Sequence, residues 1–175
     1  MSTFLISQII AVGALAAGVM TFQLKERVYI VSAFALMSSL LSLHFYVLGE
    51  YTASAIVAVS VVRFLVSAVT KRQIWMYVFI LVTAAVGWYT YAHWYNLIAI
   101  AAGLLGVIAT FQTEDKRLRV IMMSSSTTMA VHDIIVGTPV GLAVDLTVLT
   151  SGLIGYYRYY MRREGADASQ TKEPA

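Results

Sequence analysis

The sequence is poor in cysteine, proline and charge. It has no cysteine and two prolines among 175 residues, and Asp, Glu, Lys and Arg together make up 12%. The absence of cysteine excludes a disulfide, a thiolate metal site and a cysteine nucleophile. Soluble proteins carry about 25% charged residues, whereas this chain combines its low charge with a mean hydropathy of +0.77. The composition therefore indicates a membrane protein.

Long apolar runs separated by very short linkers fill most of the chain. A hydrocarbon core about 30 Å thick requires roughly 20 apolar residues per helix, and only helices or closed barrels satisfy their backbone groups there. The runs are long enough for helices, so we expect an all-α membrane protein with seven transmembrane helices. The predicted spans are residues 4–24, 29–48, 51–70, 74–92, 94–112, 118–136 and 140–160.

Lys and Arg lie in alternate linkers. The linkers that contain them are 25–27, 71–72 and 114–117, and those that contain neither are 49–50, 93 and 137–139. Basic linkers stay in the cytoplasm, so we expect a multi-pass protein with its N-terminus outside and its C-terminus cytoplasmic. The first residues, Met1-Ser2-Thr3, lack the basic stretch of a cleavable signal, and we expect the first helix to be retained. The net charge of +3 follows from this orientation and does not indicate nucleic-acid binding.

Two motifs recur at nearly constant spacing. Thr21-Phe22-Gln23 returns as Thr110-Phe111-Gln112 after 89 residues, and the His-x4-Gly stretch that begins at His44 returns at His132 after 88. This indicates two parallel three-helix repeats joined by a linker helix, a 3+1+3 layout, because a unit of three spans needs one more to restore its orientation. The predicted domains are the first repeat (1–70), the linker helix (71–93), the second repeat (94–163) and a disordered cytoplasmic tail (164–175).

The chain resembles the YgjV family of bacterial inner-membrane proteins. The resemblance is carried by residues 18–27, by their counterpart 110–117 and by the two His-x4-Gly stretches. The layout is similar to that of SWEET sugar facilitators and PQ-loop transporters. PQ-loop proteins have a proline before the glutamine where this chain has Phe22 and Phe111, which argues against a proline-hinged mechanism. The resemblance implies a location in the bacterial inner (plasma) membrane and no established substrate.

Polar residues inside the predicted spans are the candidates for a substrate site. Asp or Arg at the bilayer centre costs roughly 2.5 to 3.5 kcal/mol, so Asp145, about 9 Å along its helix from Pro139, needs a reason to be there. It could bind a cation, a proton or substrate hydroxyls. His44 and His132 lie near the outer ends of matched helices and could line one cavity and relay protons, and Asn96 is the fourth candidate. Alternatively, each of these side chains only bonds a neighbouring helix.

Three further residues are candidates for an inner gate. Gln23 and Gln112 end their helices on the cytoplasmic side, and Arg63 lies about eight residues from the inner end of the third span. Arg63 could equally extend its guanidinium to the lipid phosphates.

Small and hydroxylated residues also follow helical spacing. Ala99-x3-Gly103 and Ala102-x3-Gly106 predict close helix contacts. Ser124, Thr128 and His132 recur every four residues, which places them on one face. We expect this face to point into the protein, where it serves packing or contacts a polar solute.

Two functions remain open. The first is a transporter or facilitator for a small polar solute, with a site between the repeats; the alternative is a non-transporting receptor, scaffold or assembly subunit. We expect no enzyme, because every lysine lies outside the helices, which excludes a retinal Schiff base, and because Ser124 and His132 are about 12 Å apart along one helix. We expect no metal or cofactor. Membrane lipids and an unknown small polar solute are the expected partners, and formation of a homo-oligomer is left open.

Overall fold

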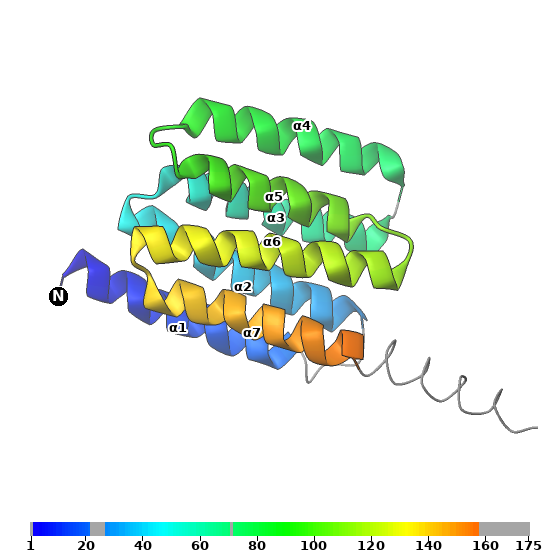
Figure 1. The fold of residues 1–175 in the computed structure, drawn as a ribbon, viewed down its shortest axis with the longest axis horizontal. Helices are drawn as coiled ribbons and strands as arrows, with labels where there is room; N and C mark the ends of the chain where they lie inside the picture. Colours follow the sequence, from blue (N-terminus) through cyan, green and yellow to red (C-terminus); the bar gives the residue numbers. More distant parts are fainter. Residues whose placement is uncertain (1, 22–26, 71, 158–175) are drawn as a thin grey trace, which may run out of the picture.

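The computed structural model describes residues 2–21, 27–70 and 72–157, which form seven helices and no strand (Figure 1). This confirms the prediction of an all-α chain. The helices are α1 (Thr3–Thr21), α2 (Arg27–Leu48), α3 (Tyr51–Val69), α4 (Gln73–Thr90), α5 (Asn96–Thr110), α6 (Asp115–Val136) and α7 (Pro139–Tyr156).

The helices lie side by side as a bundle in which α2 and α6 hold corresponding places. Helix α2 packs against both α1 and α3, and α6 packs against both α5 and α7. The two sets meet where α1 contacts α7 and where α3 contacts α5. Helix α4 lies at one edge of the bundle and packs against α3 and α5 (Figure 1).

Three helices, α1, α3 and α4, are long and apolar enough to cross a membrane by length and composition. Shorter apolar stretches occur at Ser32–Leu48, Asn96–Thr110 and Pro139–Ile154, in α2, α5 and α7. Helix α5 has only 15 residues, and α6 begins with charged residues and continues into a run of hydroxylated ones. The apolar signal is therefore clear for three helices and weaker for four.

The predicted start of the fifth helix at Trp94 is too early, because α5 begins at Asn96. The Oδ1 atom of Asn96 accepts the backbone N–H groups of Ala92 at 3.1 Å and of His93 at 2.7 Å. These bonds hold the turn between α4 and α5, since they satisfy donors that a continuing helix would have used. The predicted start of the sixth helix at Leu118 is too late, because α6 begins with a charged turn at Asp115, outside the apolar run.

Small residues let α5 approach its neighbours closely, as their spacing predicts. Ala99 and Ala102 are buried. A Cβ atom at Gly103 would overlap Cγ2 of Ile56 and lie 3.1 Å from Cγ2 of Thr83. Gly103 is thus one point at which α5 contacts both α3 and α4.

We expect Gly103→Ala to destabilise the bundle by about 1 to 3 kcal/mol, because the added methyl overpacks a contact with a branched side chain. Gly13→Ala is the matched control. Its Cβ would lie 3.6 Å from Cδ1 of Leu40, an ordinary contact, so this change should be neutral or slightly stabilising. Thermal unfolding in detergent measures both, and equal melting temperatures would contradict the packing described for α5.

Candidate functional site

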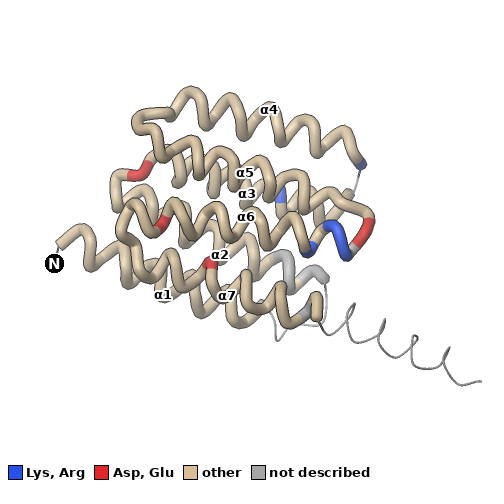
Figure 2. Tube along the Cα trace, in the orientation of Figure 1, with Lys and Arg blue, Asp and Glu red and all other residues tan. Residues whose placement is uncertain are grey.

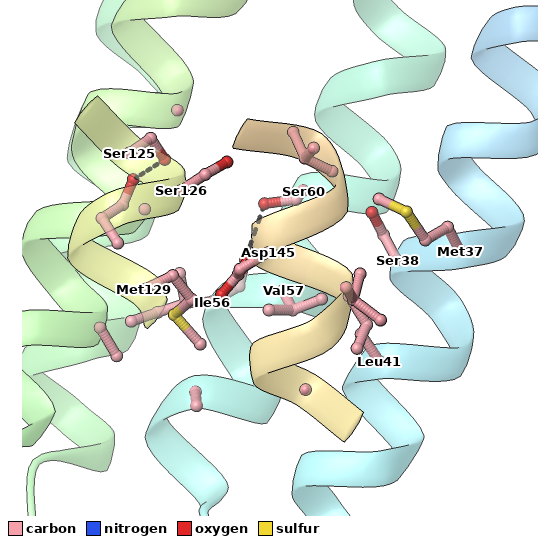
Figure 3. Close-up of a pocket in the computed structure, with 18 of the residues that line it drawn as sticks. Met37, Ser38, Leu41, Ile56, Val57, Ser60, Ser125, Ser126, Met129 and Asp145 are labelled. Atoms are coloured by element: carbon pink, nitrogen blue, oxygen red, sulfur yellow. Dashed lines mark hydrogen bonds between the residues drawn. The ribbon is translucent and has the colours of Figure 1, made fainter. Parts of the chain in front are cut away.

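A cavity of about 150 Å³ lies inside the bundle, lined by residues of α2, α3, α5, α6 and α7 (Figure 3). Its wall is mostly apolar, with a few polar side chains among methionine, phenylalanine and aliphatic ones. Small-molecule sites commonly have this composition.

Most of the lining residues occur as pairs that are 88 positions apart in the sequence. Nine residues of α2 and α3 pair with nine of α6 and α7: Phe34 with Met122, Met37 with Ser125, Ser38 with Ser126, Leu41 with Met129, Phe45 with Asp133, Ala53 with Gly141, Ile56 with Val144, Val57 with Asp145, and Ser60 with Val148. This is the same spacing that separates the two His-x4-Gly stretches. The cavity therefore lies where corresponding faces of the two helix pairs meet.

In two of these pairs one member is apolar and the other carries a carboxyl group. Asp133 and Asp145 stand on α6 and α7 where α2 and α3 have Phe45 and Val57. The basic residue in the wall, Arg63, comes instead from α3. One side of the cavity thus supplies the carboxyl groups and the other supplies the guanidinium.

Asp145 is the candidate residue that brings an unsatisfied acceptor atom to the wall. Its Oδ2 oxygen is buried and has no hydrogen-bond partner. In Figure 3 its side chain lies among Ile56, Val57 and Ser60 of α3. The Ser60 hydroxyl donates to the backbone carbonyl of Ile56 at 3.2 Å, so its proton is already used.

Asp133, which sequence reasoning did not select, is the second carboxyl in the wall and is only 2% exposed. Its Oδ1 lies 3.4 Å from Nδ1 of His132. Its Oδ2 lies against the backbone of Gly141, where a Cβ atom would overlap it. The spacing of 88 could have identified Asp133, since it occupies the position that corresponds to buried Phe45.

Arg63 is buried in the bundle, lines the cavity and does not reach the surface. Its Nη1 donates to the carbonyl of Gly103 at 3.4 Å, and its guanidinium carbon lies 4.9 Å from the ring centroid of Phe64. Gly106 leaves room for the guanidinium, because a Cβ atom there would lie 3.0 Å from Nη1. The Nε atom of Arg63 has no partner.

His44 is fully buried but does not line the cavity. Its Nδ1 lies 2.8 Å from the carbonyl oxygen of Ser7, and its Nε2 lies 2.8 Å from Oγ1 of Thr138. The ring therefore joins α2 to α1 and to the residue that precedes α7. These bonds correspond to the alternative in which His44 only bonds neighbouring helices.

His132 is also fully buried and absent from the cavity wall. Its ring packs against those of Phe45 and Tyr95, with 5.9 Å between the centroids in each case, and its Nε2 has no partner. Neither histidine lines the described cavity. Both rings instead pack against Phe45, with 5.1 Å between the centroids for His44 and 5.9 Å for His132.

Two further candidates, Asn96 and Gln112, do not line the cavity. The Oδ1 atom of Asn96 bonds the backbone of the preceding turn, and the Gln112 side chain donates to the carbonyl of Ile108 at 3.2 Å. Gln23 lies outside the described residues. Among the described residues, no group of three His, Asp or Glu side chains could hold a metal ion.

The predicted inward face of α6 is displaced by one residue. Ser124 is exposed, and the cavity is lined by Ser125, Ser126 and Met129. The Ser124 hydroxyl donates to the carbonyl of Val120 at 3.0 Å. A serine hydroxyl that donates to its own helix in this way needs no partner inside the protein. The spacing of hydroxylated residues therefore does not by itself identify the inner face of α6.

Comparison with known proteins gives a consistent result. The sequence model of the family Imp-YgjV, described as bacterial inner membrane protein, matches residues 5–163. Inner membrane protein YgjV of Escherichia coli (strain K12) is 24% identical over 169 residues, which cover 95% of this chain and 92% of that protein. No solved structure matches the chain.

We expect His44→Ala to cost about 2 kcal/mol of stability, because it leaves a buried hydroxyl and carbonyl without their partner. A double-mutant cycle with Thr138→Val should give a coupling energy of about 1 kcal/mol. His93→Ala, at an exposed position between α4 and α5, is the control and should change stability by less than about 0.5 kcal/mol. Additive effects of the His44 and Thr138 changes in detergent unfolding would show that the bridge contributes nothing.

Proposed function

Because the chain belongs to the Imp-YgjV family of bacterial inner membrane proteins, we propose that it is a transporter or facilitator for a small polar solute, with its site in the cavity. The single observation that supports this most strongly is the set of nine lining pairs at a spacing of 88. Parallel-repeat transporters bind their solutes at the interface between repeats, and the cavity occupies such a position.

In this proposal all seven helices cross the membrane as a 3+1+3 arrangement, with α4 as the linker. Several features support it. Helices α3 and α7 begin 88 residues apart, at Tyr51 and Pro139, and each follows a glycine with positive φ, 87° at Gly49 and 77° at Gly137. The contacts α1 with α7 and α3 with α5 exchange under the same correspondence. A twofold axis along the membrane normal relates the repeats.

The outer ends of the repeats are held by two corresponding contacts. Glu50 and Thr138 each precede the third helix of their repeat. The Tyr95 hydroxyl donates to Glu50 Oε1 at 3.0 Å, and the Gln8 amide lies 3.5 Å from Thr138 Oγ1. The first contact joins Glu50 to the residue that precedes α5, and the second joins Thr138 to α1. We propose that these contacts break when the cavity opens outward, and that His44 serves to position Thr138.

The inner closure is assigned to Arg63, with Gln112 retained as a predicted gate residue after the end of α5; the third predicted gate residue, Gln23, lies outside the described residues. Arg63 supports this role because it lines the cavity. Solute would pass as the outer contacts and this inner group open in turn. No catalytic step or cofactor is part of the proposal.

A non-transporting scaffold or receptor is the alternative, and the bridging contacts of His44 favour it. Such contacts suit a protein whose polar residues only hold helices together. That function does not account for the buried Oδ2 of Asp145, which bonds no helix.

The proposed orientation places the N-terminus outside and the C-terminus in the cytoplasm. It is supported by Arg72, Lys116, Arg117 and Arg119, which lie at the end of the bundle where α4 and α6 begin (Figure 2); among the Lys and Arg residues coloured in the figure, Arg63 is the exception. The chain has no cysteine, so single cysteines report without background. A cysteine at His93 should react with an impermeant thiol reagent in cells with a permeabilised outer membrane, and one at Thr113 should react only after lysis. The reverse pattern would overturn the orientation.

Alternating access is tested by the variant Val148→Cys, whose cysteine lies in the wall beside Asp145. In vesicles of defined orientation, a small charged thiol reagent should modify this cysteine when applied from either side, because both open states reach the cavity. Leu146→Cys on the same helix is the control: the side chain at this position is 45% exposed on the outer surface of the bundle and should face lipid, where the reagent reacts slowly. Modification of the Val148→Cys variant from one side alone would contradict alternating access.

A further inference from the structure

The two carboxyl groups in the cavity wall are in different situations. Asp133 Oδ1 lies 3.4 Å from the ring of His132, whereas Asp145 Oδ2 is buried without any hydrogen-bond partner. An unpaired carboxylate is costly in an apolar interior, so such a group either takes up a proton or gains a positively charged partner. Asp145 is therefore the wall residue that gains most from a cationic ligand.

The protein's own cation does not fill this role. Of the lining residues, Arg63 alone is basic, and no ion pair joins it to Asp145 within the described part of the chain. Arg63 follows Val57, the counterpart of Asp145, by six positions on α3, which is about 9 Å along the helix. It is bonded to Gly103 and rests on Phe64. The guanidinium of Arg63 thus forms no ion pair with Asp145, whose Oδ2 oxygen has no partner.

The size of the cavity and its wall restrict the ligand further. A volume of about 150 Å³ is comparable to that of an engineered cavity of roughly 150 Å³ that takes up benzene. The wall around Asp145 includes Ile56, Val57 and Met129. Such a wall favours a compact apolar body, and thioether groups adapt readily to its shape.

We propose that the cavity binds a small organic amine in its ammonium form. The ammonium N–H groups donate to Oδ2 of Asp145, and the apolar body packs against the methionine and aliphatic side chains. Asp133 adds negative potential on one side, and Arg63 repels the cation at the other, which keeps the ligand at Asp145. This assignment deepens the proposed transporter function by naming its substrate class. Passage of the amine across the membrane rests on that proposed function, whereas binding of the amine in the cavity does not.

The test uses the full chain carrying Val148→Cys, purified in detergent, and measures how fast a thiol reagent modifies the introduced cysteine. Three compounds with one carbon skeleton serve as probes: butylamine, butan-1-ol and butyrate, at fixed pH and ionic strength. Butylamine should slow the modification in a saturable manner, and the alcohol and the carboxylate should not. Protection by butyrate alone would assign the site to Arg63, and equal protection by all three would reduce it to an apolar void; either result overturns the proposal.

Variants locate the interaction. Asp145→Asn should raise the butylamine concentration for half-protection by at least about tenfold, because a charge-assisted bond is lost. Asp145→Glu keeps the charge, so its butylamine concentration for half-protection should lie within about threefold of the parent's. Ser126→Ala changes another residue of the wall, and butylamine should protect this variant at the same concentration as the parent. Unchanged protection in Asp145→Asn would overturn the proposal, and if that variant does not fold, the probe series on the parent decides.

Failure of this proposal can be distinguished from failure of the transporter proposal. The modification of the Val148→Cys variant from both sides is measured without amine. If it occurs but butylamine gives no protection, the substrate class is wrong and alternating access stands. If butylamine protects but the introduced cysteine is modified from one side only, the ammonium site stands and the transporter proposal fails.

Discussion

A polar group without a partner is expensive inside a membrane, and this constraint explains most of the polar contacts in the bundle. His44 bonds Ser7 and Thr138, and Asn96 bonds the turn before its own helix. Serine and threonine hydroxyls commonly donate to carbonyls one turn back, as Ser124 does. Each of these residues can be explained by structure alone. Against that background four buried atoms without a partner in the described part of the chain are exceptions: Arg63 Nε, Thr83 Oγ1, His132 Nε2 and Asp145 Oδ2. Of these, the Asp145 atom belongs to a carboxyl group in the cavity wall, and an ionisable residue inside a membrane is by default a candidate for function.

The second feature on which the proposed function depends is the proposed repeat, in which two halves share a backbone plan but differ in their side chains. Phe45 and Val57 fill the wall on one side, and their counterparts Asp133 and Asp145 bring charge on the other. We infer that one half of the molecule retains an apolar surface for packing and for the body of the ligand, while the other half provides recognition. In the proposed repeat, equivalent helices can then move in the same way, because they share a geometry even though their side chains differ.

The sequence predicted the helices well and the site only in part. Long apolar runs and charged linkers indicate where most helices begin and end, but the start of α5 depends on the specific bonds of Asn96, and α6 extends into its charged linker. The depth of Asp145 was readable from its distance to Pro139. The direction of a side chain around its helix was not, since membrane helices are apolar on every face and their periodicity is weak. This is why Asp133 was missed and why His44 was considered for the cavity.

The central claim is that two equivalent three-helix units move relative to each other around the cavity. Distances between spin labels test it most directly, at two pairs of exposed residues that are 88 positions apart: Tyr46 with Ile134 near the outer end, and Leu65 with Leu153 near the inner end. Alternating access predicts two distances for each pair, one for the outward-open state and one for the inward-open state. Conditions that lengthen the distance at the outer end should therefore shorten the distance at the inner end. A single distance at both ends under all conditions would contradict it.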